Sequence, residues 1–173
     1  DLGLVPTSEP YKKRTAQGLI LGPDGEKMSK SRGNVIDPLT VIADYGADTL
    51  RTYILFMGDY AIECPWNDDA IKGVNRFLDR VYNLKERVVE GDFSSSLESQ
   101  IHKCIKKVSN DIEAMKFNTA IAELMKLVNA YYEKDTITTS DYEVLIKLLY
   151  PFAPHITEEL NETVLHKTSL VYS

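Results

Sequence analysis

Apolar residues recur every three or four positions through most of the chain beyond Asn67, and this spacing restricts the fold more than any other feature of the sequence. In a helix it places the apolar side chains on one face, which must be buried against another element. The pattern is interrupted at residues 91–94 and at Pro151 and Pro154, where one helix must end and another begin. Four or five amphipathic helices joined by short links predict a helical bundle. The apolar positions of these helices are Ala70, Ile71, Val74, Phe77, Leu78, Val81 and Val88; Leu97, Ile101, Cys104, Ile105, Val108, Ile112 and Met115; Ile121, Leu124, Val128 and Tyr131; Val144, Leu145, Leu148 and Leu149; and Ile156, Leu160 and Val164.

Side chains suited to capping mark several of the expected helix starts. Asn67 is a favoured N-cap residue and precedes the first bundle helix. Ser95 with Glu98, and Ser140 with Glu143, have the spacing of a capping box, in which each side chain bonds the other residue's backbone N–H. We therefore expect bundle helices to begin next to Ser95 and Ser140.

The first part of the chain has a different character. Residues 1–36 hold three of the seven prolines and five of the nine glycines, a composition typical of loops and short strands. The apolar run at residues 18–22 is short enough for a strand. The Pro-Asp-Gly sequence at residues 23–25 is a turn in which proline presets φ and glycine supplies a positive φ. Residues 18–28 are therefore expected to form a β-hairpin.

Two short helices are expected between this hairpin and the bundle. Asp37 is a favoured N-cap and Pro38 a favoured first helical residue, and the helix that they begin ends at Gly46. A second helix is expected over residues 47–57, followed by a polar connector that contains a proline. The expected fold is therefore mainly α, with a small loop and connecting region that carries a short β-hairpin, followed by an α-helical bundle. The expected domains are residues 1–62 for the first part and residues 63–173 for the bundle.

Composition excludes several classes of protein. The formal net charge of the 173-residue chain is −6, from 20 basic against 26 acidic residues, and the pI is about 5.1, so the chain is not a generally basic nucleic-acid binder. Apolar residues make up 43% of the chain, which is enough for a buried core. Cys64 and Cys104 lie far apart, which excludes a disulfide scaffold and a zinc ribbon, and no metal site is expected. Since no apolar run approaches about 18 residues, no membrane span is expected, and the expected compartment is the cytoplasm.

The pentapeptide Lys-Met-Ser-Lys-Ser at residues 27–31 has the clearest chemical character of any segment. Residues 10–36 hold six basic residues against two acidic ones, a local charge of +4 in an acidic chain. Ammonium groups neutralise a polyphosphate, while hydroxyl and backbone N–H groups donate hydrogen bonds to it. Gly25 and Gly33 flank the segment and would permit the loop to move. The alternative interpretation is a solvated, lysine-rich loop.

The pentapeptide is identical to the KMSKS signature of class I aminoacyl-tRNA synthetases. Segments around it resemble the leucyl-tRNA synthetase family, and two later segments resemble the helical anticodon-binding domain that leucyl, isoleucyl and valyl enzymes share. The resemblance implies that the first part is the end of a catalytic domain and that the second is an anticodon-binding-type bundle. Two alternatives stay open, an isoleucyl or valyl specificity and a non-catalytic RNA-binding helical module. The segments are residues 7–13, 45–51, 56–58, 65–68 and 76–81 for the leucyl family, and residues 117–121 and 153–160 for the anticodon-binding domain.

The resemblance also implies a reaction and a role for each residue of the pentapeptide. In the leucyl family, the leucine carboxylate attacks the α-phosphorus of ATP, which gives leucyl-adenylate and pyrophosphate, and the leucine then passes to tRNA(Leu). Lys30 would be the main phosphate contact and Lys27 a second one, both stabilising charge in the transition state. Ser29 and Ser31 would supply hydroxyl bonds or hold the loop's shape, and Met28 belongs to the same ATP-binding segment. The implied substrates and partners of the full enzyme are ATP with Mg²⁺, leucine and tRNA(Leu).

The other signature of the class, a HIGH-type sequence whose histidines contact ATP, is not found here. The three histidines are His102, His155 and His166, and none stands in such a sequence. Because adenylate formation needs both signatures to face each other across the ATP, we expect the chain alone to be inactive. The chain also opens at Asp1 rather than at a methionine, which suggests a piece of a longer protein.

A line of basic residues follows one face of the first bundle helix. Lys72, Arg76 and Arg80 are spaced by four residues, and Arg87 lies seven residues further on. Residues at this spacing share a helix face, here the face opposite the apolar stripe. With the resemblance in view, the functional interpretation is a contact line for the tRNA backbone. The alternative is an ordinary solvated face.

The remaining polar and aromatic candidates are expected to be structural. The four basic residues within residues 102–107 are interpreted as a solvated cluster. Cys104 lies on an apolar stripe and is expected to be buried. His155 follows a proline at an expected helix start, and we interpret it as a structural histidine with a hydrogen-bond partner. Trp66 and Tyr60 are expected to anchor the two parts of the chain to each other.

Overall fold

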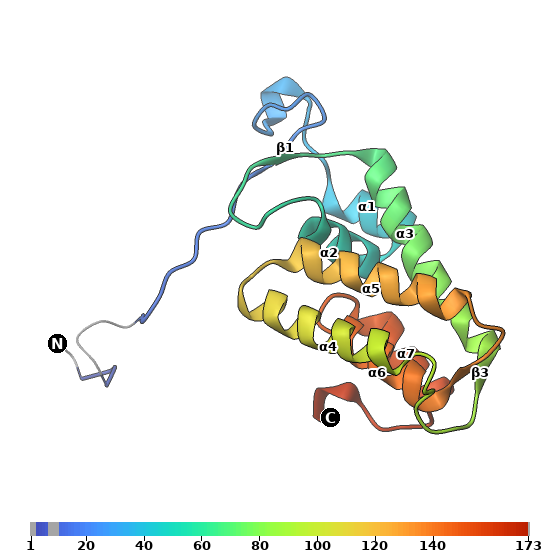
Figure 1. The fold of residues 1–173 in the computed structure, drawn as a ribbon. Helices are drawn as coiled ribbons and strands as arrows, with labels where there is room; N and C mark the ends of the chain where they lie inside the picture. Colours follow the sequence, from blue (N-terminus) through green and yellow to red (C-terminus); the bar gives the residue numbers. More distant parts are fainter. Residues whose placement is uncertain (1–2, 7–10, 173) are drawn as a thin grey trace.

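The computed structural model describes residues 3–6 and 11–172, and most of its elements are helical (Figure 1). Residues 7–10, part of the segment 7–13 that resembles the leucyl family, lie outside the described residues. The elements confirm the mainly α fold class. The helices of the described ranges are α1 (Pro38–Tyr45), α2 (Ala47–Phe56), α3 (Asp68–Asn83), α4 (Glu98–Glu113), α5 (Phe117–Tyr132), α6 (Thr139–Leu149) and α7 (Pro154–Thr163), with short 3-10 turns η1 (Lys30–Arg32), η2 (Leu84–Arg87) and η3 (Leu170–Tyr172). The strands, each of two residues, are β1 (Ile20–Leu21), β2 (Cys64–Pro65), β3 (Val88–Val89) and β4 (Ile137–Thr138).

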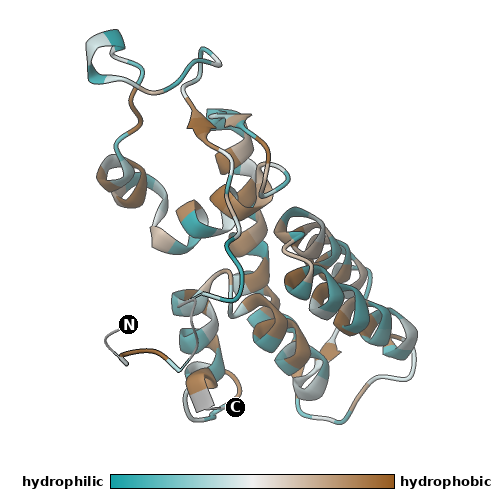
Figure 2. Ribbon diagram, turned by 90° about the vertical axis from the view of Figure 1, so that its left-hand side faces the viewer, coloured by the Kyte–Doolittle hydropathy of each residue, from teal (hydrophilic) through white to brown (hydrophobic). Residues whose placement is uncertain are grey.

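Helices α3 to α7 form a bundle whose apolar faces make its core (Figure 2). The expected stripes are buried there, with Val81, Ile121 and Leu145 each 0% exposed. Full burial of one such side chain contributes about 2 kcal/mol, so this core is the main source of the bundle's stability. The hydroxyl of Tyr142, which is buried in this core, donates to the carbonyl oxygen of Val81 at 3.0 Å. Cys104 is buried in the same core, as expected.

A second, smaller core, called the small core below, lies between α1, α2 and the start of α3. Its buried members are Val41, Leu50, Tyr53, Trp66, Ile71 and Val74. Its largest members are Tyr53 of α2 and Trp66 next to β2, whose rings meet edge to face at 4.9 Å. The hydroxyl of Tyr53 accepts the backbone N–H of Asn67 at 2.8 Å, which fixes the start of α3 against α2. Helix α3 then supplies Ile71 and Val74 to this core and its later apolar residues to the bundle core. One helix therefore belongs to both cores and holds them together.

Helix α2 is also bound to the start of α7 and to the link that precedes it. The carboxylate of Asp48 accepts the backbone N–H of Ile156 at 2.7 Å and contacts Nδ1 of His155 at 2.8 Å. One helical turn further along α2, Arg51 donates to the carbonyl oxygen of Pro151, and Thr52 donates to that of Phe152. His155 is thus the structural histidine that we expected. The side chains of one face of α2 bridge the two parts of the chain.

The aromatic residues of the connector were correctly predicted as anchors. Trp66 is 6% exposed, and its indole N–H donates to Asp68 at 2.8 Å. The ring of Tyr60 meets that of Phe117, at the start of α5, edge to face at 5.6 Å. Both rings are therefore used in packing, one in the small core and one against the bundle.

The expected hairpin at residues 18–28 is only partly present. The turn exists, since Gly25 N–H donates to the carbonyl oxygen of Gly22 at 2.9 Å, and a single antiparallel bridge joins Leu21 and Lys27. The strand itself pairs elsewhere: β1 lies parallel to β2, with Ile20 opposite Cys64. A strand so short cannot be stable alone, and its partner comes from the distant connector rather than from the next residues.

Two of the capping predictions are confirmed and two are wrong. Asp37 caps α1 and Asn67 caps α3, each by accepting backbone N–H groups of the first turn. Ser95 and Glu98 form no capping box, because α4 begins after Leu97 without a side-chain cap. Helix α6 is capped by Thr138, whose hydroxyl accepts the N–H of Asp141, and not by Ser140 with Glu143.

The first bundle helix is shorter than its apolar pattern predicted. Helix α3 ends at Asn83, and Val88 lies in β3, which pairs in parallel with β4. The same pairing explains the misplaced cap of α6. Because Thr138 is the last residue of β4, it is extended, as an N-cap residue must be.

The end of α4 is tied to the start of α5 through Asp111. Its carboxylate accepts hydrogen bonds from the ammonium of Lys107 and, at 2.6 Å, from the hydroxyl of Thr119. Burial alone would raise the pKa of this carboxyl, but the hydrogen bonds from Lys107 and Thr119 outweigh it and hold the pKa below its ordinary value. A carboxyl whose pKa is lower in the folded state stabilises the fold above its unfolded pKa, and that contribution is lost as the pH falls through the folded pKa.

The substitution Asp111→Asn should lower the free energy of unfolding near neutral pH by about 1–3 kcal/mol, because it weakens two hydrogen bonds to a charged group. The difference from the parent chain should shrink as the pH falls below about 4, the ordinary pKa of an aspartate, and through the lowered pKa of Asp111, where the parent loses the same charge. Urea unfolding at several pH values measures both effects. Glu113→Gln, on an exposed position of the same helix, is the control. A difference that does not change with pH would contradict this role of Asp111.

Candidate functional site

The Lys-Met-Ser-Lys-Ser segment lies on a loop that projects from the rest of the structure (Figures 1 and 2). The loop leaves β1, passes the turn at residues 23–25, continues through the 3-10 turn η1 and returns to α1. Its hydrophilic tip contrasts with the apolar helix faces below it in Figure 2. Gly33 has a φ of +68°, so the chain reverses there at a residue without a side chain. The segment is therefore presented outward, with both of its ends held close to the small core.

The base of the loop is anchored on the connector by backbone pairing. Gly18 N–H donates to the carbonyl oxygen of Tyr60 at 2.9 Å, and the N–H of Trp66 donates to the carbonyl oxygen of Leu21 at 3.0 Å. A Cβ atom at Gly18 would lie 2.1 Å from the carbonyl oxygen of Ile62, so only glycine allows this approach. The position of the loop is thus set by the connector, and through it by the small core.

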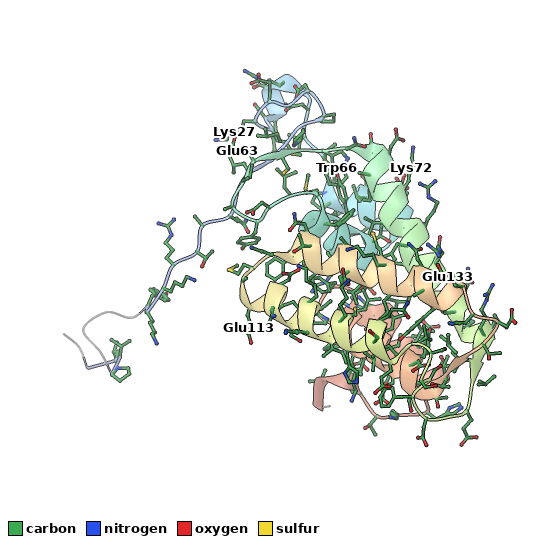
Figure 3. The ribbon with its side chains drawn as sticks, in the orientation of Figure 1. Lys27, Glu63, Trp66, Lys72, Glu113 and Glu133 are labelled. Carbon is green, nitrogen blue, oxygen red and sulfur yellow. The ribbon has the colours of Figure 1, made fainter. Side chains whose placement is uncertain are left out.

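The pentapeptide has one inward residue and two outward ammonium groups. Met28 packs against the small core, whereas Lys27 and Lys30 are exposed. Figure 3 marks Lys27 at the projecting loop. Across residues 3–6 and 11–172, no ion pair or hydrogen bond engages either ammonium group. The hydroxyls of Ser29 and Ser31 lie 2.8 Å apart and bond each other.

The acidic residues of the loop are engaged with other partners and leave the two lysines free. Glu26 pairs with Arg32 at 3.0 Å. The carboxylate of Asp24 accepts the amide of Asn34 and the backbone N–H of Glu26. These hydrogen bonds lower the pKa of Asp24 below its ordinary value, with the Glu26 N–H as the largest cause and Asn34 the next. The loop can therefore offer two uncompensated cations to an anion such as a polyphosphate.

Asp24 and Asn34 were not singled out from the sequence, although both are part of this site. Their contact depends on the chain reversal at Gly33, which a reading of neighbouring residues does not reveal. One signal was available: aspartate and asparagine side chains next to turns commonly bond nearby backbone groups.

The basic line on α3 is less uniform than its spacing suggests. The ammonium of Lys72 pairs with Asp69 at 3.1 Å, and its position on α3 can be followed in Figure 3. The guanidinium of Arg80 donates to the side chain of Asn129 at 2.8 Å and lies over the ring of Tyr132, 4.6 Å from its centre. These contacts join α3 to α5. The charged groups of Lys72 and Arg80 thus already have partners within the chain.

Arg87 is engaged by other groups of the chain, whereas Arg76 is not. Arg87 donates to the carbonyl oxygens of Tyr132 and Lys134 at 3.3 and 3.0 Å, and it also lies over the ring of Tyr132. In the part of the chain that the structure describes, Arg76 has no ion pair or hydrogen bond, and its side chain is exposed. The structure therefore does not bring the whole line to one free surface, and Arg76 is its member with an unengaged charge.

The cluster at residues 102–107 contains partners of its own. His102 lies 3.9 Å from Glu98, and Lys107 bonds Asp111. The basic residues of the cluster are exposed, as the solvated interpretation expects. Among the described residues, no group of three or more histidine, cysteine, aspartate or glutamate side chains could hold a metal ion. No helix in the described part of the chain is long and apolar enough to cross a membrane.

Two protein families match separate parts of the chain. The family described as tRNA synthetases class I (I, L, M and V) matches residues 4–67, which include the loop. The family described as the anticodon-binding domain of tRNA ligase matches residues 95–173, which include helices α4 to α7.

Curated relatives and solved structures extend these matches over nearly the whole chain. A leucine–tRNA ligase of Alkaliphilus oremlandii is 52% identical over 165 residues, 95% of this chain and 21% of the relative. The ligase of Bdellovibrio bacteriovorus is 48% identical over 171 residues, 94% of this chain and 21% of the relative. The chain thus spans about a fifth of the length of these relatives.

Among solved structures, the leucyl-tRNA synthetase of Agrobacterium radiobacter, in a ternary complex with tRNA and LeuAMS, matches with a TM-score of 0.85 and 34% identity, over 98% of this chain and 25% of that chain. The methionyl-tRNA synthetase of Mycobacterium tuberculosis shares the fold, with a TM-score of 0.60 and 18% identity over 83% of this chain and 38% of that chain. The loop and the helical bundle are therefore matched together, in one chain and in one arrangement. The chain belongs to the leucyl-tRNA synthetase family of the class I tRNA synthetases.

Proposed function

We propose that this chain supplies the ATP-phosphate loop and the tRNA-binding bundle of a leucine–tRNA ligase. In the first step, a carboxylate oxygen of leucine attacks the α-phosphorus of ATP. The bond from that phosphorus to the bridging oxygen breaks, and leucyl-adenylate and pyrophosphate form. In the second step, a ribose hydroxyl at the end of tRNA(Leu) attacks the leucyl carbonyl and AMP leaves. Relatives that are named leucine–tRNA ligase and are 45–52% identical support the choice of leucine over isoleucine or valine.

The observation that carries this proposal is the pair of free ammonium groups of Lys27 and Lys30. Adenylate formation adds negative charge to the phosphoryl oxygens and to the leaving pyrophosphate. Cations held in place near that charge stabilise the transition state more than the ground state, and they need little reorganisation during the reaction. In the proposal, Lys30 is the main phosphate contact and Lys27 the second. The hydroxyls of Ser29 and Ser31 exchange their mutual hydrogen bond for bonds to phosphate oxygens.

Magnesium enters this proposal as part of the nucleotide substrate. Mg²⁺ is commonly bound through substrate phosphates with few protein carboxylates. The contribution of this chain is then the cationic loop, and the metal requires no cluster of carboxylates on it. We also propose a cytoplasmic location, which agrees with the two free thiols of Cys64 and Cys104.

We infer that the two parts of the chain, residues 1–62 and 63–173, divide this work. The first carries the phosphate loop at the end of a catalytic domain, and the second is the anticodon-binding-type bundle. Because the chain spans about a fifth of the relatives' length, we propose that it does not form adenylate by itself. Adenylate formation requires groups on several sides of the ATP, held together in one geometry.

The substitution Lys30→Ala in the full-length synthetase should lower the kcat of leucine-dependent pyrophosphate exchange by about 10²–10³-fold, the scale for loss of one preorganised donor to a developing oxyanion. Lys27→Ala should have a smaller effect of the same kind. The control is Lys106→Ala, which removes an exposed ammonium group from α4. Normal exchange by the Lys30→Ala enzyme, with its fold intact, would favour the alternative of a non-catalytic RNA-binding module.

We propose that Arg76 contributes to the tRNA surface of the bundle. It has an exposed guanidinium on α3 with no partner among the described residues, so binding a phosphate would break no existing contact. Arg80 and Arg87 also belong to the proposed line, but their bonds hold other elements together. Arg80 bonds Asn129 and joins α3 to α5, and Arg87 bonds backbone carbonyls and joins η2 to the end of α5 and the segment beyond it. Lys72, paired with Asp69 on an exposed surface, could exchange that partner for a phosphate at little cost.

The substitution Arg76→Glu in the full-length synthetase should weaken binding of tRNA(Leu) about tenfold and make log Kd less dependent on log salt by about one unit. Titration of tRNA at several salt concentrations measures both quantities. Lys106→Glu, a charge reversal on α4, is the matched control. Unchanged affinity and an unchanged salt slope for Arg76→Glu would remove this residue from the proposed interface.

A further inference from the structure

The amide of Asn34 is the most densely bonded side chain of the loop. Its Oδ1 accepts the backbone N–H of Ser29 at 2.8 Å. Its Nδ2 donates to both carboxylate oxygens of Asp24 at 3.1 Å, and it lies 3.4 Å from the carbonyl oxygen of Lys27. One side chain thus binds the turn before the pentapeptide and two backbone groups within it.

The residues around Asn34 and Asp24 favour the contact between these two side chains. A Cβ atom at Gly22 would lie 2.7 Å from Oδ1 of Asp24 and 2.8 Å from Nδ2 of Asn34, so a side chain there would separate the two. Asp24 is held in turn by the backbone N–H of Glu26, which donates to its Oδ1 at 3.1 Å. The positive φ of Gly33 returns the chain so that Asn34 reaches Asp24. Geometry on both sides therefore favours one closed arrangement.

This arrangement acts on the residues that carry the two free ammonium groups. Asn34 binds the backbone at Lys27 and at Ser29, and Ser29 immediately precedes Lys30. The other contacts within the loop are the exposed pair of Arg32 with Glu26, the Ser29–Ser31 hydroxyl bond and turn bonds of η1. An exposed ion pair of this kind contributes little order. The backbone bridge between Leu21 and Lys27 and the packing of Met28 hold the start of the pentapeptide to the base of the loop, but they do not reach Lys30. Asn34 is the side chain that joins the backbone at Lys27 to the backbone at Ser29, so it links the placement of Lys27 to that of Lys30.

We propose that Asn34 and Asp24 form a latch that positions Lys27 and Lys30 for the polyphosphate of ATP. The inference rests on the proposed function and adds two positioning residues to it. Neither residue touches the reacting atoms. They act by fixing the loop before the nucleotide arrives, so that ordering the two ammonium groups does not oppose the reaction.

The latch can be tested by exchanging its two side chains in the full-length synthetase. Asn34→Asp alone removes the N–H donors and places two carboxylates against each other, which should open the latch. Combining Asn34→Asp with Asp24→Asn restores one amide and one carboxylate. The carboxylate at position 34 can still accept the N–H of Ser29 and receive the amide from position 24. The amide oxygen at position 24 can still accept the N–H of Glu26.

The Asn34→Asp enzyme should show a kcat for pyrophosphate exchange that is lower by about ten- to a hundredfold, with little change in the KM for leucine. The double exchange should recover part of that loss, which a general structural defect would not do. Recovery stays incomplete because a carboxylate at position 34 cannot donate to the carbonyl oxygen of Lys27. Glu26→Gln, which breaks only the exposed ion pair with Arg32, is the matched control and should retain activity.

The possible failures of the latch and of the proposed function are distinct. A fully active Asn34→Asp enzyme beside an impaired Lys30→Ala enzyme would overturn the latch and leave the proposed function in place. A double exchange that is as impaired as Asn34→Asp alone would also overturn the latch. An unimpaired Lys30→Ala enzyme would remove the proposed function, and the positioning role with it.

Discussion

The edge-to-face contact of Tyr53 and Trp66, with its hydrogen bond to the start of α3, is the interaction on which the placement of the loop depends. Trp66 comes directly after β2, and its backbone N–H bonds the carbonyl oxygen of Leu21 in β1. The loop begins right after β1. A chain of short contacts therefore leads from a buried aromatic pair to the ammonium groups of the pentapeptide. Strands of two residues have little stability of their own, so the small core must supply it.

The same small core is continuous with the bundle in two ways. Helix α3 contributes Ile71 and Val74 to the small core and Phe77 and Val81 to the larger one. Helix α2 binds the first turn of α7 through Asp48, whose carboxylate is nearly buried and fully engaged. A surface on the bundle and the exposed loop thus belong to one framework. In the proposed function, this framework keeps a bound tRNA and a bound nucleotide in a fixed relation.

Features that depend on neighbouring residues could be predicted from the sequence. The caps at Asp37 and Asn67 and the break at Pro151 need only a few adjacent positions, and the structure confirms them. Ser140 was chosen as a cap on the same kind of evidence, and the choice was wrong. The pairing of β4 with β3 makes Thr138 the last extended residue, and that pairing joins distant parts of the chain. The expected hairpin is only partly present for the same reason, since β1 pairs with the distant β2.

The residues of the candidate site also differ in whether they depend on adjacent or on distant positions in the chain. The pentapeptide made Lys27 and Lys30 candidates directly, because the motif is continuous in the sequence. Asn34 and Asp24 emerged only from the structure, since their contact requires the reversal at Gly33. The basic line on α3 and η2 shows what spacing alone leaves out. Spacing groups Arg76 with Arg87, but the structure uses Arg87 to bind backbone carbonyls, and spacing carries no information about such partners.

The central claim is that the ammonium groups of Lys27 and Lys30 are free in this structure and meet the phosphates of ATP in the full-length synthetase. Acetylation of lysines by an activated ester, read by mass spectrometry with and without saturating ATP and Mg²⁺, tests it most directly. Both amines should react readily without nucleotide and be protected by ATP, while Lys106 on α4 should react equally in both conditions. Equal acetylation of Lys27 and Lys30 with and without ATP would show that these amines do not meet the nucleotide.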